Sequence, residues 1–346
     1  MLLLDLPAML AEENSTGIAT TATTGLRIDE LAGLCKASGD RLRLEMLQVL
    51  RQDSLAVQEL CAIFDIRQPA LSHHLKVMAG AGLVASRREG NSIYYRRAVL
   101  GRQASLQASL YNAIDQIPLS PPLAERLLDV QRNREHSSQQ FFQQNADKFR
   151  AQQDLIASYT QYADTVAQLL ADAPLGQRRL ALEVGPGDGA FLLHLAPQFE
   201  QVIALDNAAE MLAQSEALAT QEQLANIEFV HGDTRHGRLQ QVSADCIVVN
   251  MVLHHTPSPA DIFQDLANCL SESGVLLVTD LCHHDQDWAR EACGDLWLGF
   301  EPEDLLAWAQ RAGLDEIASV YLAQRNGFQI QVRLFGHLQA NEGPSE

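Results

Sequence analysis

The sequence predicts an α/β protein of two domains, an N-terminal winged helix-turn-helix and a C-terminal, Rossmann-like, doubly wound fold. Two patterns support this prediction. Residues 54–97 combine two helical repeats, a short connection and a hairpin, in the order of a winged helix. From residue 180 onward, short apolar runs alternate with helical segments, and a glycine-rich stretch follows the first run. Such alternation is typical of a mostly parallel sheet covered by helices.

Length and charge agree with this division. A chain of 346 residues exceeds what one ordinary core organises. The net charge is −19, yet residues 32–102 carry 11 basic and 6 acidic side chains, a positive region in an acidic protein. No apolar run is long enough to cross a bilayer and the first ten residues lack a basic stretch, so we expect a cytoplasmic protein with no membrane partner. The scattered cysteines are expected to be reduced thiols.

The winged-helix pattern is expected within a domain at 28–117. A mobile leader is expected at 1–27, because its threonine-rich part lacks apolar periodicity. Apolar spacing predicts helices over 28–50 and 57–64, a third that begins near Pro69 and stops at Gly80, and a last one at 100–117. Two short strands, 83–84 and 93–95, are expected to be joined by a polar turn at 87–92.

The third helix has the composition of a recognition helix. Leu71, Leu75 and Met78 share one face, which leaves small and polar side chains on the other. Such side chains can enter a major groove about 12 Å wide, and arginines at the wing tip would contact phosphates. The candidate DNA-binding residues are Gln68, Ala70, Ser72, His73, Lys76, Arg87 and Arg88. The alternative is a solvated helix face beside a basic hairpin that binds nothing.

Four segments of this region carry a resemblance to a known family: 57–62, 68–75, 82–84 and 94–96. Together they resemble the ArsR family of winged-helix repressors over 28–117. The resemblance implies a homodimer that pairs through its first and last helices, so that two recognition helices read palindromic double-stranded operator DNA. Metal-sensing relatives use clustered thiolates or histidines of the last helix, whereas only Cys61 of the thiolates remains here and 100–117 contains no histidine. We therefore predict no metal site.

The C-terminal part, 173–346, opens on the stretch Glu183-Val-Gly185-Pro-Gly187-Asp-Gly189, which follows a predicted strand and precedes a helix. Glycines at this place permit a tight turn and let a ligand approach the backbone. The spacing alone also fits a dinucleotide. Acidic residues at later strand ends narrow the choice: Asp206 is placed to accept hydrogen bonds from both ribose hydroxyls, and Asp233 from an adenine amino group.

These residues, with 245–255 and the strand at 273–279, resemble a class I S-adenosylmethionine-dependent methyltransferase from about 141 to 335. The resemblance implies a domain that binds S-adenosylhomocysteine or S-adenosylmethionine, with a dinucleotide-binding or empty fold as the alternative. The candidate ligand-binding residues are Glu183, Gly185, Gly187 and Gly189 near the methionyl and ribose groups, Asp206 at the ribose, Asp233 at the adenine and Asn250 near the sulfur. Methyl transfer demands mainly in-line placement of a nucleophile, so the catalytic residues stay unknown.

Two further groups of residues are open to interpretation. The aromatic segment 287–300 either covers the pocket or packs on the sheet, and the same holds for Phe141, Phe142 and Tyr159 in the polar, helical connector predicted at 118–172. Four histidines flank the expected pocket mouth, either as bases or ligands or, in the interpretation we prefer, in supporting or surface roles. They are His254, His255, His283 and His284.

The fused architecture resembles ArsR-type regulators that respond to S-adenosylhomocysteine. We therefore expect a dimeric repressor that senses an S-adenosyl compound, controls genes of the S-adenosylmethionine cycle and transmits occupancy through the connector. One alternative is an active methyltransferase for a small-molecule acceptor, with an autoregulatory DNA-binding domain. Another is a DNA-binding scaffold with a vestigial pocket.

Overall fold

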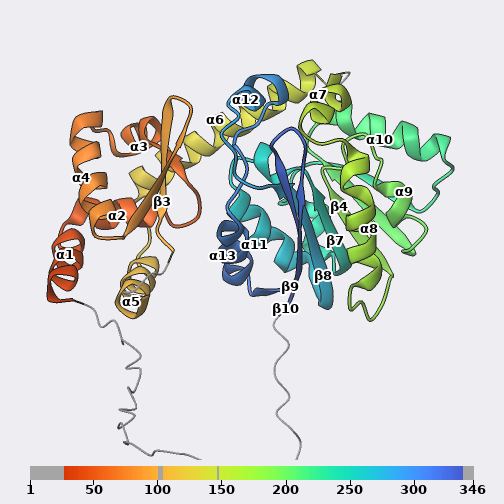
Figure 1. Ribbon diagram of the computed structural model, residues 1–346. Coiled ribbons are helices and arrows are strands. Elements are labelled where there is room, and N and C mark those ends of the chain that lie inside the picture. Colours follow the sequence, from red (N-terminus) through yellow and green to blue (C-terminus); the bar gives the residue numbers. More distant parts are fainter. Residues whose placement is uncertain (1–26, 100–103, 146–147, 338–346) are drawn as a thin grey trace, which may run out of the picture.

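The computed structural model describes residues 27–99, 104–145 and 148–337. They form two bodies side by side, a small winged helix and a larger Rossmann-like domain, and helix α6 runs between them (Figure 1). This confirms the predicted fold class. All but the last residue of the expected leader lies outside the described residues. None of the described helices combines the length and apolarity that a bilayer crossing requires.

The winged domain has a helix-turn-helix beside a three-stranded sheet of order β1-β3-β2. Its buried core takes side chains from all of its longer elements, for example Leu34, Met46, Leu60 and Leu75. Its elements are α1 (Ile28–Ser38), α2 (Arg41–Val49), β1 (Leu55–Ala56), α3 (Val57–Phe64), α4 (Gln68–Gly80), β2 (Val84–Glu89), β3 (Ser92–Arg97) and α5 (Ala104–Asp115).

The wing is longer than the sequence predicts. Strands β2 and β3 pair without interruption from Val84 opposite Arg97 to Glu89 opposite Ser92, so only two residues remain for the turn. Arg87 and the residue after it, expected in a six-residue turn, are strand residues instead. Polar side chains on both faces hid the alternation that marks a half-buried strand. One of those faces is nevertheless covered, because the C-terminal domain packs against it.

The Rossmann-like domain is built on a seven-stranded sheet of order β6-β5-β4-β7-β8-β10-β9. The four pairings among β6, β5, β4, β7 and β8 are parallel, and β10 is antiparallel to both of its neighbours. The strands are β4 (Leu180–Val184), β5 (Gln201–Asp206), β6 (Ile227–His231), β7 (Ala244–Asn250), β8 (Leu270–Leu281), β9 (Leu314–Ala323) and β10 (Gln329–His337).

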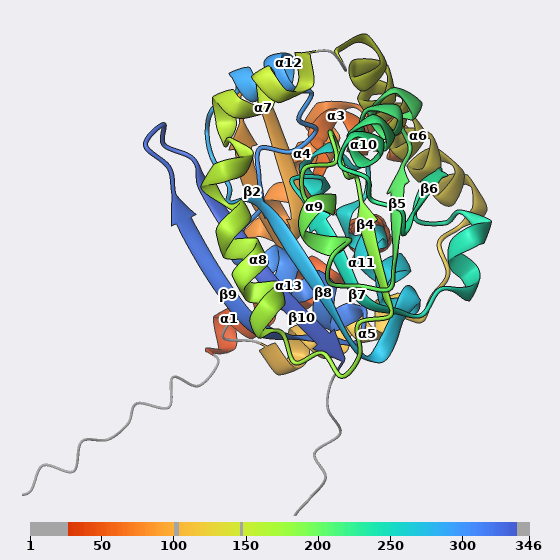
Figure 2. The same cartoon turned by 90° about the vertical axis from the view of Figure 1, so that its right-hand side faces the viewer.

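Helices cover both faces of this sheet (Figures 1 and 2). On the face toward the winged domain lie α11 (Pro259–Cys269) and α13 (Pro302–Arg311), which bury Phe263, Leu305 and Trp308. On the opposite face lie α8 (Ala163–Asp172) and the short α9 (Leu192–Leu195), and Val166 and Leu170 fill a second core there. The helix that the sequence predicts after the glycine-rich stretch is only the four-residue α9. Helix α10 (Ala209–Gln221) flanks β5 and β6.

The predicted connector contributes to both bodies. It consists mainly of α6 (Pro121–Asn145), α7 (Phe149–Ile156) and α8. Leu123 and Val130, in the first half of α6, are buried in the winged-domain core, whereas Ile156 and the helix α8 belong to the core of the C-terminal domain. Helix α6, about 37 Å long at 1.5 Å per residue, therefore begins inside one domain and ends against the other.

Candidate functional site

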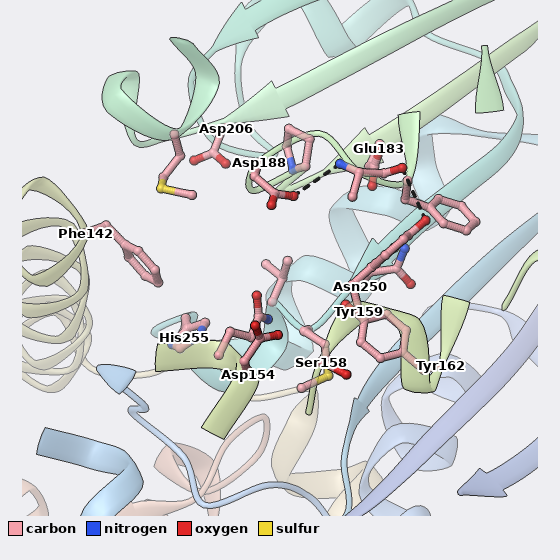
Figure 3. Close-up of a pocket in the computed structure, with 18 of the residues that line it drawn as sticks. Phe142, Asp154, Ser158, Tyr159, Tyr162, Glu183, Asp188, Asp206, Asn250 and His255 are labelled. Atoms are coloured by element: carbon pink, nitrogen blue, oxygen red, sulfur yellow. Dashed lines mark hydrogen bonds between the residues drawn. The ribbon is translucent and has the colours of Figure 1, made fainter. Parts of the chain in front are cut away.

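A cavity of about 300 Å³ opens at the carboxyl ends of β4, β5 and β7 (Figure 3). This is the place where doubly wound sheets bind ligands, and the volume is at the lower end of the range for small-molecule pockets. Five groups of residues line it: the turn after β4, the end of β5, Met211 of α10, the loop after β7, and side chains from α6, α7 and the segment after α7.

The glycine-rich stretch forms the turn after β4. Gly185 has a φ of 66°, and a Cβ atom built there would lie 2.5 Å from Cγ2 of Val252. A side chain at this position would clash with the loop after β7, so only glycine lets the two loops meet at the cavity floor. Gly187 and Gly189 also have positive φ values and shape the turn, but neither lines the cavity.

Two predicted acids reach the cavity from strand ends. Glu183 is 1% exposed, and burial, with the nearby Asp188 carboxylate, raises the pKa of Glu183 to about 8. Burial likewise raises the pKa of Asp206 to about 6, although its carboxylate accepts a 2.8 Å hydrogen bond from the backbone N–H of Ala208. Across the described chain, no hydrogen-bond partner reaches Oε2 of Glu183. Both carboxyl groups thus retain capacity to accept bonds from a ligand.

Asn250 ends β7 and lines the same cavity. Its Oδ1 and Nδ2 are both buried, and neither has a hydrogen-bond partner among the described residues. An unsatisfied buried polar group costs about 1–3 kcal/mol, which a ligand with a matching donor and acceptor would recover. Asn250 is therefore the side chain of the cavity most in need of a partner.

The cavity lining is acidic. Four carboxyl groups line it, and among the described residues no lysine or arginine does so. These acids are Asp154, Glu183, Asp188 and Asp206. Such a wall favours hydroxyl groups and cationic groups and disfavours phosphates.

The structure brings four of the seven predicted ligand-binding residues to the cavity: Glu183, Gly185, Asp206 and Asn250. Asp233 does not line it. Its carboxylate pairs with the guanidinium of Arg235 at 2.8 Å, beyond the end of β6.

Sequence reasoning left out most of the wall opposite the strands, which the connector supplies. Phe142 comes from α6, Asp154 from α7, and Ser158, Tyr159 and Tyr162 from the segment after α7 (Figure 3). The aromatic residues of the connector were the available signal. Of the two interpretations given for Phe142 and Tyr159, a position over the pocket fits their placement, whereas no residue of 287–300 lines the cavity.

The predicted recognition helix is α4. Gln68, Ala70, His73 and Lys76 are exposed on its outer face, and Ser72 is half-buried beside them. Leu71, Leu75 and Met78 face the core, as the periodicity predicts.

The two candidate arginines of the wing differ in exposure. Arg88 is exposed, whereas the side chain of Arg87 is only 16% exposed and lies 2.5 Å from Oε1 of Glu89. Glu89 is itself buried, because it pairs with Arg290 of the C-terminal domain. On the same face, Tyr94 packs against Trp297 with ring centroids 6.1 Å apart. The segment 287–300 thus contacts the wing.

Comparison with known proteins identifies both regions. Residues 40–86 match the family described as bacterial regulatory protein, arsR family, and residues 182–278 match a methyltransferase domain. The biofilm growth-associated repressor of Agrobacterium fabrum is 42% identical over 85 residues, which make up 25% of this chain and 72% of the repressor.

Other matches lie in the second region. An uncharacterized methyltransferase of Mycobacterium bovis is 31% identical over 112 residues, which are 32% of this chain and 55% of that protein. The chain thus spans about half the length of this relative. A solved S-adenosylmethionine-dependent methyltransferase of Clostridium acetobutylicum superposes with a TM-score of 0.44 and 13% identity, covering 53% of this chain and 93% of that one.

Proposed function

Because the chain belongs to the arsR family of bacterial regulatory proteins and carries a methyltransferase domain, we propose that it is a DNA-binding transcriptional regulator with an S-adenosyl compound as its effector. The effector is S-adenosylhomocysteine or S-adenosylmethionine. The regulated genes are those of the S-adenosylmethionine cycle, since a sensor of these compounds is useful where they are made and consumed.

The observation that carries the proposal is the course of α6. Val130 of this helix lies in the winged-domain core, and Phe142, twelve residues later, lines the cavity. A ligand that shifts Phe142 therefore acts on a helix anchored in the DNA-binding domain. For regulation the ligand must bind the two DNA-binding states with unequal affinity, since equal affinity shifts no population.

The chemistry of the lining supports an S-adenosyl ligand over a dinucleotide. A pyrophosphate would meet four carboxyl groups and no described cation. An S-adenosyl compound presents ribose hydroxyl donors and an ammonium group, and its single carboxylate is balanced by that ammonium, so it carries less negative charge than a pyrophosphate. We assign Asp206 to the ribose hydroxyls, Glu183 and Gly185 to the methionyl end, and Asn250 to the groups nearest the sulfur, while Gly187 and Gly189 shape the turn from outside the cavity.

DNA recognition is proposed for the exposed face of α4 and for the wing. Apolar side chains remain exposed at the two ends of the winged domain, on Ile28 of α1, Leu106 of α5 and Ile117 just beyond α5, at 75%, 40% and 62%. These positions support pairing of two chains through their first and last helices, which would suit a palindromic operator.

The test is binding of the full-length protein to DNA of its own promoter, measured by fluorescence anisotropy during titration with each nucleoside. We expect the affinity for DNA to change at least tenfold in wild type and to stay unchanged in Asp206→Ala. The exposed Glu210→Gln, four residues further along the chain, is the matched control and should respond like wild type. Equal DNA affinity with and without both nucleosides in wild type would refute the sensor.

An active methyltransferase is the second candidate, and His255 favours it. This histidine lines the cavity, and burial lowers the pKa of its imidazole well below the usual value, so the ring is neutral and its unprotonated nitrogen can accept a hydrogen bond from the nucleophile of a methyl acceptor. Labelled methyl donor incubated with the protein and a cell extract should give a labelled product that His255→Ala no longer forms. If no product forms and the ligand still changes the affinity for DNA, the result supports the sensor function and rejects the methyltransferase.

A further inference from the structure

Beside the cavity lies a group of buried ionisable side chains that the proposed sensor function does not use. His254 and His255 follow β7, and Asp295 follows the helix α12 (Trp288–Cys293). His254 and Asp295 are 1% and 3% exposed, so of the supporting or surface roles expected for His254 only a supporting one fits its burial. One nitrogen or oxygen atom from each of the three residues lies within 4.8 Å of the others. Although the sequence predicts no metal site, we propose that His254, His255 and Asp295 bind one divalent transition-metal ion of the zinc class.

The separations from Asp295 suit a shared ion, which would replace the 3.3 Å contact between Nδ1 of His255 and the carbonyl oxygen of Gly294. Oδ1 of Asp295 is 3.9 Å from Nε2 of His254 and 3.8 Å from Nδ1 of His255, which is too long for a hydrogen bond. Two bonds of about 2.1 Å to one ion hold their ligand atoms no more than about 4.2 Å apart. Both separations satisfy that limit. Neither carboxylate oxygen of Asp295 has a hydrogen-bond partner within the described ranges.

The surroundings orient the donors. Nδ1 of His254 lies 2.8 Å from Oδ1 of Asp280, a buried carboxylate at the end of β8. A carboxylate on one ring nitrogen leaves the other nitrogen free to ligate and increases its basicity. Two neutral imidazoles, two carboxylates and a divalent ion sum to zero charge, which is the arrangement that buried charges require. Two imidazoles and a carboxylate are ligands that zinc and its neighbours prefer.

The proposed metal site lies between the cavity loop after β7 and the segment 287–300 that contacts the wing. The backbone N–H groups of Leu296 and Trp297 donate to the carbonyl oxygen of His254 at 2.9 and 3.1 Å. Trp297 packs against Tyr94 of the wing, and His255 lines the cavity. An ion held by Asp295 and both histidines would therefore fasten the cavity loop to the segment that contacts the wing.

A proton is the competing occupant. Burial alone would lower the pKa of His254, but the carboxylates of Asp280 and Asp295 outweigh it and raise the pKa to about 9. A protonated His254 would balance one of the two carboxylates without any metal. The two occupants make opposite predictions for metal content, so they are distinguishable by experiment.

The test uses full-length untagged protein, stripped with a chelator and titrated with Co²⁺ and then Zn²⁺. We expect one Co²⁺ per chain by elemental analysis, d–d absorption that Zn²⁺ abolishes, and a metal-dependent rise in the thermal midpoint. His255→Gln and Asp295→Asn should each bind at least tenfold more weakly, and Asp280→Asn about 10- to 100-fold more weakly. Cys35→Ser, which removes the exposed thiol, is the matched control and should bind like wild type.

Circular dichroism of the metal-free proteins checks that each variant folds. Because two ligand variants are tested, the experiment remains decisive if one of them fails to fold. Less than 0.2 equivalents of bound metal in wild type (roughly the level of adventitious binding), or unchanged affinity in both folded ligand variants, would overturn the proposal in favour of the proton. Nucleoside binding is measured separately, so failure here leaves the sensor proposal standing.

Discussion

The guanidinium of Arg134 lies 4.4 Å above the ring of Trp297, and this stacking joins α6 to the C-terminal domain. The same guanidinium donates two hydrogen bonds, of 2.6 and 2.7 Å, to the carboxylate of Glu59 in α3 of the winged domain, and one to the carbonyl oxygen of Pro257. One side chain thus connects the DNA-binding domain, the helix that reaches the cavity and the segment that contacts the wing. Lysine can also stack on an aromatic ring, but only the planar guanidinium of arginine can do so while it binds a carboxylate through two nitrogens.

Replacement of Arg134 should uncouple the domains. In Arg134→Met, Glu59 loses its partner in a mostly buried site, so the free energy of unfolding should fall by about 2 to 4 kcal/mol. The nucleoside should still bind, but its effect on DNA affinity should shrink. Arg132→Met is the control on the same helix, because Arg132 pairs with Asp129 while 69% exposed and should have little effect. Full retention of the ligand effect in a folded Arg134→Met protein would contradict this role.

A second prediction concerns pH and Asp53, which lies between the domains. Asp53 accepts a hydrogen bond from the Ser258 hydroxyl, yet burial raises the pKa of Asp53 to about 6. The pKa of Asp53 is thus higher in the folded protein than in the unfolded chain. Its contribution to the free energy of unfolding is therefore full below about pH 4 and is lost as the pH rises through 6.

Asp53→Asn mimics the protonated side chain, so its stability should lack this dependence. Relative to the variant, wild type should lose up to about 3 kcal/mol between pH 4 and pH 7, as about two pKa units imply. Thermal unfolding of both proteins across this range measures the difference and removes the effect of other titrating groups. A constant difference would mean that Asp53 keeps an ordinary pKa.

Ligand binding should release a proton from Glu183. With a pKa near 8, this buried carboxyl group is mostly protonated at pH 7. A cationic amino group or sulfonium placed beside it would lower the pKa of Glu183 and expel most of one proton. Calorimetry of nucleoside binding in buffers of different ionisation enthalpy reports that proton. Glu183→Gln should bind without proton release, and equal enthalpies in all buffers for wild type would count against contact between this carboxyl and a cation.

Much of the site could be predicted because it depends on local sequence rules. Asp206 and Asn250 end predicted strands of a parallel sheet, and such ends meet at one edge, so their convergence follows from topology. Gly185 could be predicted as a turn residue because its backbone needs a positive φ. Asp233 sits at a comparable strand end, but Arg235, two residues away, holds its carboxylate.

The rest depends on contacts between distant segments. Phe142 reaches the cavity only because α6 is long enough to extend from one domain to the other, and helical periodicity does not say where a helix points. The sequence predicts Glu89 to be an ordinary polar turn residue. Its carboxylate is buried because it pairs with the guanidinium of Arg290, 201 positions away. Strand β9 lacks the apolar run that marks the parallel strands because it is half-exposed, and β10 lacks it because its buried residues include Gln331 and Arg333.

The two wing arginines provide the last prediction, since they lie on adjacent residues of β2 with different surroundings. Arg88 is exposed, and its Nε donates only to the nearby carbonyl oxygen of Gly90, so its guanidinium can meet a phosphate. Arg88→Ala should therefore weaken binding to all DNA sequences alike and reduce the slope of log affinity against log salt by about 1. Arg87 donates to the carbonyl oxygen of Gly299 at 3.4 Å and pairs with Glu89. Arg87→Ala should therefore leave the salt slope unchanged and alter the response of DNA affinity to the nucleoside. Equal losses of salt slope in both variants would show that the wing leaves the C-terminal domain when it binds DNA.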